Sequence, residues 1–179
     1  MNFMFLEYAK KAKNAINRRQ ETNEHYAAVR QFIKAPVGGK LLDIGVGSDI
    51  MLQKLSDKGL DLYGVDISAA DRNRSIDEIA LMGRADIEEL PYDDNDFDCV
   101  TTLHTPPLWE DKKAALTEIL RILKAGGRFI CVFTFDSDTG LGTPPRALRE
   151  KARAAGFVNV AVKILRAEGT YLLIGEKPC

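Results

Sequence analysis

The chain has 179 residues, of which 45% are hydrophobic and 28% are charged. This length and composition fit one compact α/β domain over residues 1–179, able to bury about 70% of the surface of its unfolded chain. The formal net charge of −1 gives no electrostatic reason to expect nucleic acid or an anionic membrane as a partner.

Three cysteines, Cys99, Cys131 and Cys179, lack the spacing of metal ligands, and their odd number argues against a disulfide framework. We expect reduced thiols in a cytoplasmic protein, and no metal. The apolar run at the N-terminus is interrupted by Glu7 and Lys10, so it is too short to act as an export signal or to span a membrane.

Apolar residues at helical spacing predict a helix from Glu21 to Lys34, and Pro36 and two glycines end it. Residues 1–35 are expected to form an N-terminal helical cap, and residues 36–179 the core. Four residues of this cap could fold over a ligand as a lid, although Tyr26 shares its apolar stripe with core positions; the four are Tyr8, His25, Tyr26 and Arg30.

A buried strand starting at Lys40 runs into Gly45-Val46-Gly47, and a second strand, Asp61 to Asp66, ends on an acid. Glycines at this place let the backbone turn tightly and let a ligand approach the main chain. Asp66 follows Gly45 by 21 residues, close to the roughly 20 expected between such a turn and a ribose-binding carboxylate. The pattern predicts a nucleotide-cofactor site.

Two residues decide which cofactor suits this loop. Ile50 occupies the place of the third glycine in a dinucleotide fingerprint, and Asp43 precedes the first glycine by two residues. A carboxylate there would repel a diphosphate and attract a cationic amino-acid group. A nicotinamide-dependent oxidoreductase is therefore the weaker alternative.

The central elements alternate between helix and strand, which predicts a mostly parallel sheet. A short helix is expected over Ile50–Lys58, another near Asp71–Ile79, and strands at Leu81–Ala85 and Phe97–Leu103. Leu116, Ile119, Leu120 and Leu123 lie on one face of the next helix, which is expected to stop at Gly126-Gly127.

The C-terminal third contains a strand, a helix and a hairpin. We expect a fifth strand over Arg128–Phe135 and a helix that starts at Thr143-Pro144-Pro145, with the Thr143 hydroxyl as its cap, and ends at Gly156. Two further strands, Phe157–Leu165 and Tyr171–Glu176, should pair antiparallel around a turn at Gly169.

Four motifs together resemble the class I S-adenosylmethionine-dependent methyltransferases, and most closely their type 11, small-molecule branch. The first two are the Asp43-x-Gly45-x-Gly47 loop with Asp66, and the segment Gly83 to Tyr92. The others are Asp93–Val100 and the run from Ala115 through Gly126-Gly127 to Ile130. The chain departs from the family at Ser48-Asp49, where a small residue and a third glycine are usual.

This resemblance implies a Rossmann-like, seven-stranded, mostly parallel sheet in the order 3-2-1-4-5-7-6, with the last strand antiparallel and helices on both faces. It implies S-adenosyl-L-methionine as the cofactor and a small molecule as the methyl acceptor. The cofactor-binding residues that it implies are Asp43, Gly45, Gly47, Asp66, Ile67, Asp86, Ile87 and Leu103. Of these, Asp86 is expected against the adenine amino group, Ile67 beside the adenine ring, and Ile87 in contact through its backbone.

His104 is expected to end the fourth strand near the reacting methyl group, where it could act as a general base or simply line the pocket. Thr105-Pro106-Pro107 matches only part of the motif with which related enzymes methylate amides and nucleobases. The loop at 136–141, where larger relatives insert acceptor-recognition elements, is short. The acceptor site is therefore expected to be open, or to be completed by the N-terminal cap or by another subunit of a homodimer. Because of this loop and Ser48-Asp49, a retired cofactor-binding or partner subunit is the alternative to an enzyme.

Overall fold

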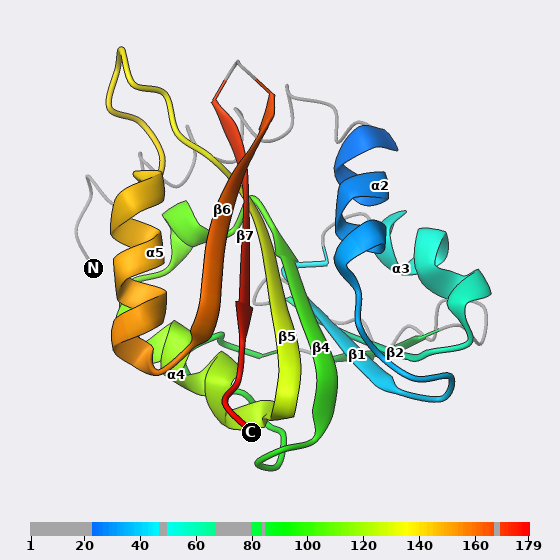
Figure 1. The fold of residues 1–179 in the computed structure, drawn as a ribbon. Coiled ribbons are helices and arrows are strands. Elements are labelled where there is room, and N and C mark those ends of the chain that lie inside the picture. The colour runs from blue at the N-terminus through cyan, green and yellow to red at the C-terminus, as the bar shows by residue number, and fades with distance from the viewer. Residues whose placement is uncertain (1–22, 47–49, 67–79, 84, 167–168) are drawn as a thin grey trace.

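Seven strands form one sheet in the order β3-β2-β1-β4-β5-β7-β6, as the sequence analysis expects (Figure 1). The computed structural model describes residues 23–46, 50–66, 80–83, 85–166 and 169–179. The strands are β1 (Lys40–Ile44), β2 (Asp61–Val65), β3 (Ala80–Gly83), β4 (Phe97–Leu103), β5 (Leu123–Thr134), β6 (Val158–Arg166) and β7 (Thr170–Glu176).

Strand directions bring the carboxyl ends of β1 to β5 to one edge of the sheet. β1 pairs in parallel with both β2 and β4, β2 with β3, and β4 with β5. β7 runs antiparallel to both of its neighbours. We call the shared edge the carboxyl rim. The order of the strands reverses between β1 and β4, which is where open α/β sheets bind their ligands.

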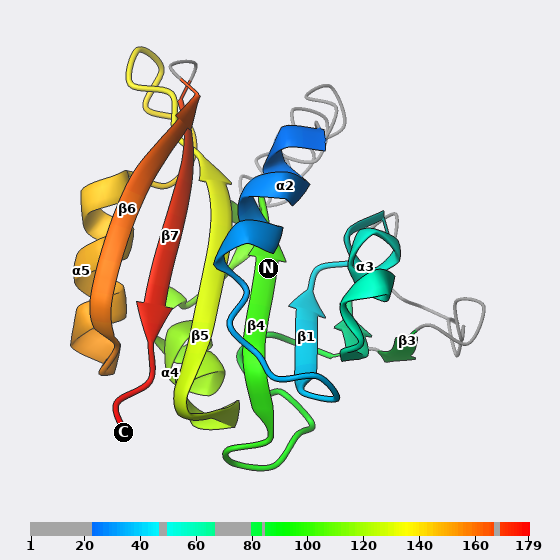
Figure 2. The same cartoon turned by 45° about the vertical axis from the view of Figure 1, so that its right-hand side comes forward.

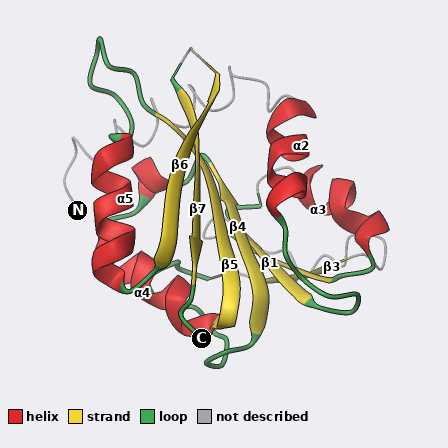
Figure 3. Cartoon of the chain, in the orientation of Figure 1, coloured by secondary structure: helices red, strands yellow, loops and turns green. Residues whose placement is uncertain are grey.

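Helices cover both faces of the sheet. In two views, α2 (Asn23–Phe32) and α3 (Ile50–Leu55) lie on one face, and α4 (Lys112–Ile122) and α5 (Pro145–Ala155) on the other (Figures 2 and 3). Two short 3-10 helices, η1 (Ser56–Lys58) and η2 (Pro106–Leu108), follow α3 and β4. Among the residues with a described position, no helix is long and apolar enough to cross a bilayer.

Alternate residues of the central strands enter two separate hydrophobic clusters. On β1, Leu42 and Ile44 pack on the side of α4 and α5, whereas Leu41 packs on the side of α2 and α3. The buried thiols divide in the same way, because Cys131 lies in the first cluster and Cys99 in the second. This two-residue alternation is expected of strands with both faces covered.

The expected helix stop at Gly126-Gly127 is wrong. α4 ends at Ile122, and Leu123 already has the extended conformation that starts β5, five residues before the expected Arg128. Gly126 has φ of +73°, and the pairing of β4 with β5 changes register between Phe97 and Cys99. The glycines thus belong to an irregularity inside a strand, which is a second common use of glycine.

α5 begins at Pro145, and no side chain caps it, so the expected Thr143 cap is also wrong. Thr143 is only 3% exposed, and its amide donates to Thr134 O at 3.2 Å, which ties it to the end of β5. Gly156 ends the helix with φ of +113°, as predicted. The terminal hairpin is confirmed, and the helix expected at 71–79 lies outside the described residues.

Candidate cofactor and methyl-transfer site at the carboxyl rim

The turn after β1 requires glycine for two reasons. Gly45 has φ of +77°, which L-residues rarely adopt, and a Cβ built on it would lie 2.4 Å from Thr105 Cγ2. The Gly45 and Val46 amides both donate to Val65 O, at 2.7 and 3.3 Å, so the turn is fastened to the end of β2. Gly47, the other predicted site glycine, lies outside the described residues.

Asp43, on β1, is buried beneath the carboxyl rim rather than exposed on its surface. It is 3% exposed, and its Oδ1 accepts a hydrogen bond from Thr101 Oγ1 at 2.7 Å. The neighbouring hydroxyl, Thr102 Oγ1, donates to Ile44 O at 2.8 Å. A carboxylate is therefore held between β1 and β4, directly below the point where the strand order reverses.

Asp66 follows β2 immediately and is half-buried at the rim. Its amide donates to Gly83 O at 3.2 Å, which links the end of β2 to the end of β3. The Gly45 turn, bonded to Val65 O, is thus one residue away from Asp66. The structure places Asp66 beside the glycine turn, as predicted, while Ile67 lies outside the described residues.

Asp86 lies in a tight turn after β3 that is closed by its own hydrogen bonds. Its Oδ1 accepts the Glu88 amide hydrogen at 3.0 Å, and its carbonyl accepts that of Glu89 at 3.1 Å. The side chain of Asp86 is exposed, whereas Ile87 is half-buried and packs against the cluster under α4. A carboxylate accepts several hydrogen bonds, so Asp86 retains capacity for an exocyclic amine.

His104 directly follows β4 and contacts helix α2 of the N-terminal cap. It has φ of +60°, its amide donates to Val132 O at 2.6 Å, and its ring centroid lies 5.4 Å from that of His25 on α2. Both side chains are about 95% buried. Leu103, the residue before it, packs in the cluster under α2.

The other cap residues expected to form a lid hold the helix to the body of the protein. Tyr26 is 4% exposed and packs in the cluster between α2 and the sheet. Arg30 donates to both carboxylate oxygens of Asp57, at 2.5 and 2.8 Å, and to Lys54 O. Tyr8 lies outside the described residues. His25 contacts the predicted site residue His104, and Tyr26 shares its hydrophobic cluster with Leu103.

Residues 42–131, half of the chain, match the family described as Methyltransferase domain. The chain belongs to this family. The matched segment runs from β1 into β5 and includes the described rim residues Asp43, Gly45, Asp66, Asp86 and His104. The resemblance to class I S-adenosylmethionine-dependent methyltransferases is thereby confirmed.

Known methyltransferases resemble this domain in sequence and in fold. A demethylmenaquinone methyltransferase of Corynebacterium kroppenstedtii is 32% identical over 112 residues, which cover 60% of this chain and 47% of the relative. The chain thus spans about half the length of the curated relatives that it matches.

Two solved structures share the fold at lower identity. One is a complex between the Haloferax volcanii Trm112 methyltransferase activator and a methyltransferase, with a TM-score of 0.74 and 23% identity over 100% of this chain and 99% of that chain. The other, Haemonchus contortus phosphoethanolamine N-methyltransferase 2 in complex with S-adenosyl-L-methionine, has a TM-score of 0.74 and 17% identity over 88% of this chain and 53% of that one.

The side chain of Thr105 is bonded to other side chains inside this methyltransferase domain. Its hydroxyl accepts from Trp109 Nε1 at 3.0 Å and lies 2.5 Å from Thr102 Oγ1, while its methyl group faces Gly45. This polar group, which begins the partial amide- and nucleobase-methylation motif, is thus engaged inside the fold. The bond from Trp109 to Thr105 is not among the expectations from the sequence, although a separation of four residues is a usable signal.

Two further points concern metal binding and the surface hollow of the structure. Among the residues described, no group of three or more His, Cys, Asp and Glu side chains is placed to hold a metal ion. A surface hollow of about 430 Å³ lies at the opposite, amino ends of the strands, lined by Lys34, Asp98, Lys124 and the double glycine, among others. None of the predicted site residues lines it, so it is separate from the rim.

Proposed function

We propose that this chain is an S-adenosylmethionine-dependent methyltransferase that acts on a small molecule. The observation that carries the proposal is the position of Asp66, half-buried at the end of β2 and one residue from the carbonyl that fastens the Gly45 turn. A carboxylate in this place can accept hydrogen bonds from both hydroxyls of a ribose. The Haemonchus neighbour, a complex with S-adenosyl-L-methionine, supports this choice of cofactor.

The residues present fit an adenosyl sulfonium with a cationic amino-acid end. Asp66 would hold the ribose and Asp86 the adenine amine, and the buried charge of Asp43 would favour the cation from beneath. The remaining cofactor contacts proposed here are Gly45, Gly47, Ile67, Ile87 and Leu103. When bound, this cofactor supplies an activated methyl group with a neutral leaving group, so the protein mainly positions the reactants.

His104 is the proposed general base. At the end of β4 it borders the reversal point of the sheet, and a neutral imidazole there would take the proton from a hydroxyl or amine acceptor. The contact with His25 brings the cap helix to the same place, so we propose that α2 forms one wall of the acceptor site.

Two exposed leucines near the rim favour an acceptor with an apolar part. Leu108 in η2 follows β4 and is 38% exposed, and Leu141 follows β5 and is 56% exposed. The demethylmenaquinone methyltransferase is named for an acceptor of this kind.

We also propose a cytoplasmic location, which the three unbridged cysteines support. A homodimer is part of the same proposal.

Calorimetric titration with S-adenosylhomocysteine tests the proposal most directly. Asp66→Ala should weaken binding by about 1–3 kcal/mol, because it removes the hydrogen bonds to the ribose. Asp61→Ala, at the opposite end of the same strand, is the matched control and should bind as the wild type does. Wild-type protein that does not bind below about millimolar concentration would contradict the proposal and favour the retired partner subunit.

A further inference from the structure

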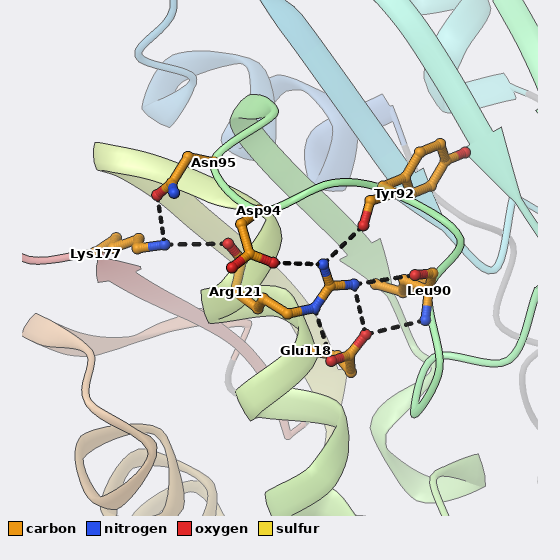
Figure 4. A network of polar contacts seen from close by, with 7 residues as sticks. All are labelled: Leu90, Tyr92, Asp94, Asn95, Glu118, Arg121 and Lys177. Carbon is orange, nitrogen blue, oxygen red and sulfur yellow. Dashed lines mark hydrogen bonds and ion pairs between the residues drawn. The ribbon is translucent and has the colours of Figure 1, made fainter.

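Helix α4 holds the backbone of the segment that follows the Asp86 turn. Glu118 Oε2 accepts the Leu90 amide hydrogen at 3.1 Å, and Arg121 Nη2 donates to Leu90 O at 3.0 Å (Figure 4). Arg121 Nη1 also donates to Tyr92 O at 2.7 Å. Both backbone polar groups of Leu90 are therefore bonded to side chains of one helix.

The two side chains of α4 also fix one another. Arg121 Nε and Nη2 donate to the two carboxylate oxygens of Glu118 at 2.9 and 2.8 Å, and Nη1 pairs with Asp94 at 2.9 Å. The bond from Arg121 lowers the pKa of Glu118, so Glu118 is a carboxylate at neutral pH. A bidentate arginine–carboxylate pair has a defined geometry, which a lysine could not reproduce.

A second attachment holds the other side of the turn. Glu88 Oε1 accepts the amide hydrogen of Asp111 at 2.6 Å, and Asp111 is the N-cap of α4. Glu88 is also the residue whose own amide binds the Asp86 carboxylate. The Asp86 turn is thus connected to the beginning of α4 through Glu88 and to its body through Leu90.

We infer that Glu118 and Arg121 are positioning residues that set the recognition of the adenine amino group by Asp86. This inference rests on the proposed function. Neither side chain is placed at the rim; both act through the backbone of Leu90. Because a hydrogen bond weakens steeply with distance and angle, a small shift of the turn reduces the preference for an amino group over an oxo group.

The test compares two ligands that differ at this one position of the purine. S-adenosylhomocysteine carries a 6-amino group and S-inosylhomocysteine a 6-oxo group, so the ratio of their dissociation constants measures recognition of the amine. The wild type should prefer the adenosyl compound by about tenfold or more, and Arg121→Met should reduce this preference about three- to tenfold. Glu118→Gln, which keeps the size of the side chain, should reduce it in the same direction.

The matched control is Arg128→Met. Arg128 pairs with Glu176 between β5 and β7, at an exposure comparable to that of Arg121, 20% against 29%. Arg128→Met and Arg121→Met should both lower thermal stability, but only Arg121→Met should change the ligand preference. A merely structural role for the Glu118–Arg121 pair would move the melting temperatures alone.

Three outcomes would overturn the inference. They are an unchanged preference in both folded α4 variants, an equal loss of preference in Arg128→Met, and a wild type that binds both compounds equally well. A wild type that binds neither compound contradicts the proposed function itself, and so is distinguished from failure of the positioning role.

Discussion

At the scale of single residues, the rim is shaped by a contact between a glycine and a threonine. Gly45 leaves the space that the methyl group of Thr105 occupies, while the hydroxyl of Thr105 turns toward Thr102 and Trp109. The glycine of a nucleotide-binding motif is usually explained by the approach of a ligand. Here the protein's own side chain imposes the same requirement.

Gly45→Ala should destabilise the protein by about 2–4 kcal/mol, because it adds both a left-handed alanine and an overlap with Thr105. Urea unfolding measures this loss. Gly38→Ala is the control, since Gly38 has φ of +73° but nothing within 4 Å of its added Cβ; it should cost only about 1 kcal/mol.

Thr105→Ser tests the overlap itself, because it removes the methyl group and keeps the hydroxyl. In this background, Gly45→Ala should cost about 1–2 kcal/mol less than in the wild type. Equal costs in the two backgrounds would show that the backbone conformation alone makes glycine necessary.

The sequence predicts the rim residues unevenly. The positions of Gly45 and Asp66 follow from local order, since each directly follows a strand whose apolar pattern is visible in the chain. The contact of His25 with His104 joins residues far apart in the chain, through the packing of α2 on the sheet. Periodicity predicts the helix but not the neighbour that it will meet.

At the scale of secondary-structure elements, α4 has a capped start and an abrupt end. The carboxylate of Asp111 accepts the amide hydrogens of Lys113 and Ala114. These bonds, that from Ala114 first, lower the pKa of Asp111. The ionised cap therefore stabilises the folded protein above the unfolded pKa of about 3.9, and this contribution disappears as the pH falls through the lower folded pKa.

Asp111→Asn should separate charge from capping, because asparagine is also a good N-cap. We expect the variant to melt at a lower temperature than the wild type near about pH 6.5, and the difference to shrink by about pH 3. Calorimetric melting curves at both pH values check this. A difference that stays constant with pH would contradict a role for the ionised carboxylate.

The boundary between α4 and β5 shows why one expectation failed. Apolar spacing continues through Leu123, and the double glycine is a common helix ending, so local rules extend the helix. In the structure, Leu123 instead pairs with Phe97 at the start of β4. A Cβ on Gly127 would lie 2.7 Å from Lys124 O, so the glycine is needed by the strand irregularity itself. A pattern of neighbouring residues cannot predict this pairing, because Phe97 lies 26 residues before Leu123 in the chain.

At the scale of the whole molecule, the sheet separates two hydrophobic cores, one on each face. We expect both cores to be exposed in one event when the central strands separate. Cys99 and Cys131 are fully buried on opposite faces, and Cys179 is exposed. Burial raises the pKa of Cys99 to about 12 and that of Cys131 well above its ordinary value. Neither buried thiol is therefore reactive in the folded protein.

A thiol reagent should label Cys179 at once in the native protein, and Cys99 and Cys131 only on unfolding. The two slow rates should be equal, because β4 and β5 are adjacent central strands and expose both thiols in the same event. Single-cysteine variants distinguish the sites. If Cys99 reacted faster than Cys131, the face under α2 would open independently of the other.

The strand order could be predicted because of the family resemblance, whereas the alternation of elements predicts only a mostly parallel sheet. The reversal of order between β1 and β4 depends on contacts between strands that are 58 residues apart along the chain, as Asp43 and Thr101 are. No local pattern contains that information. The four motifs, in their order along the chain, predict the strand order because they identify the family and with it the whole fold.

The threonine bonds between β1 and β4 have a further consequence for ligand binding. Thr101 and Thr102 donate to Asp43 Oδ1 and to the Ile44 carbonyl, so these polar groups at the carboxyl rim are held in place before a ligand binds. A ligand that binds there does not have to reorient these dipoles. The entropy lost on binding therefore comes mainly from the ligand and from the loops that follow the strands. Residence time should therefore respond more to substitutions in those loops than to conservative changes in the strands.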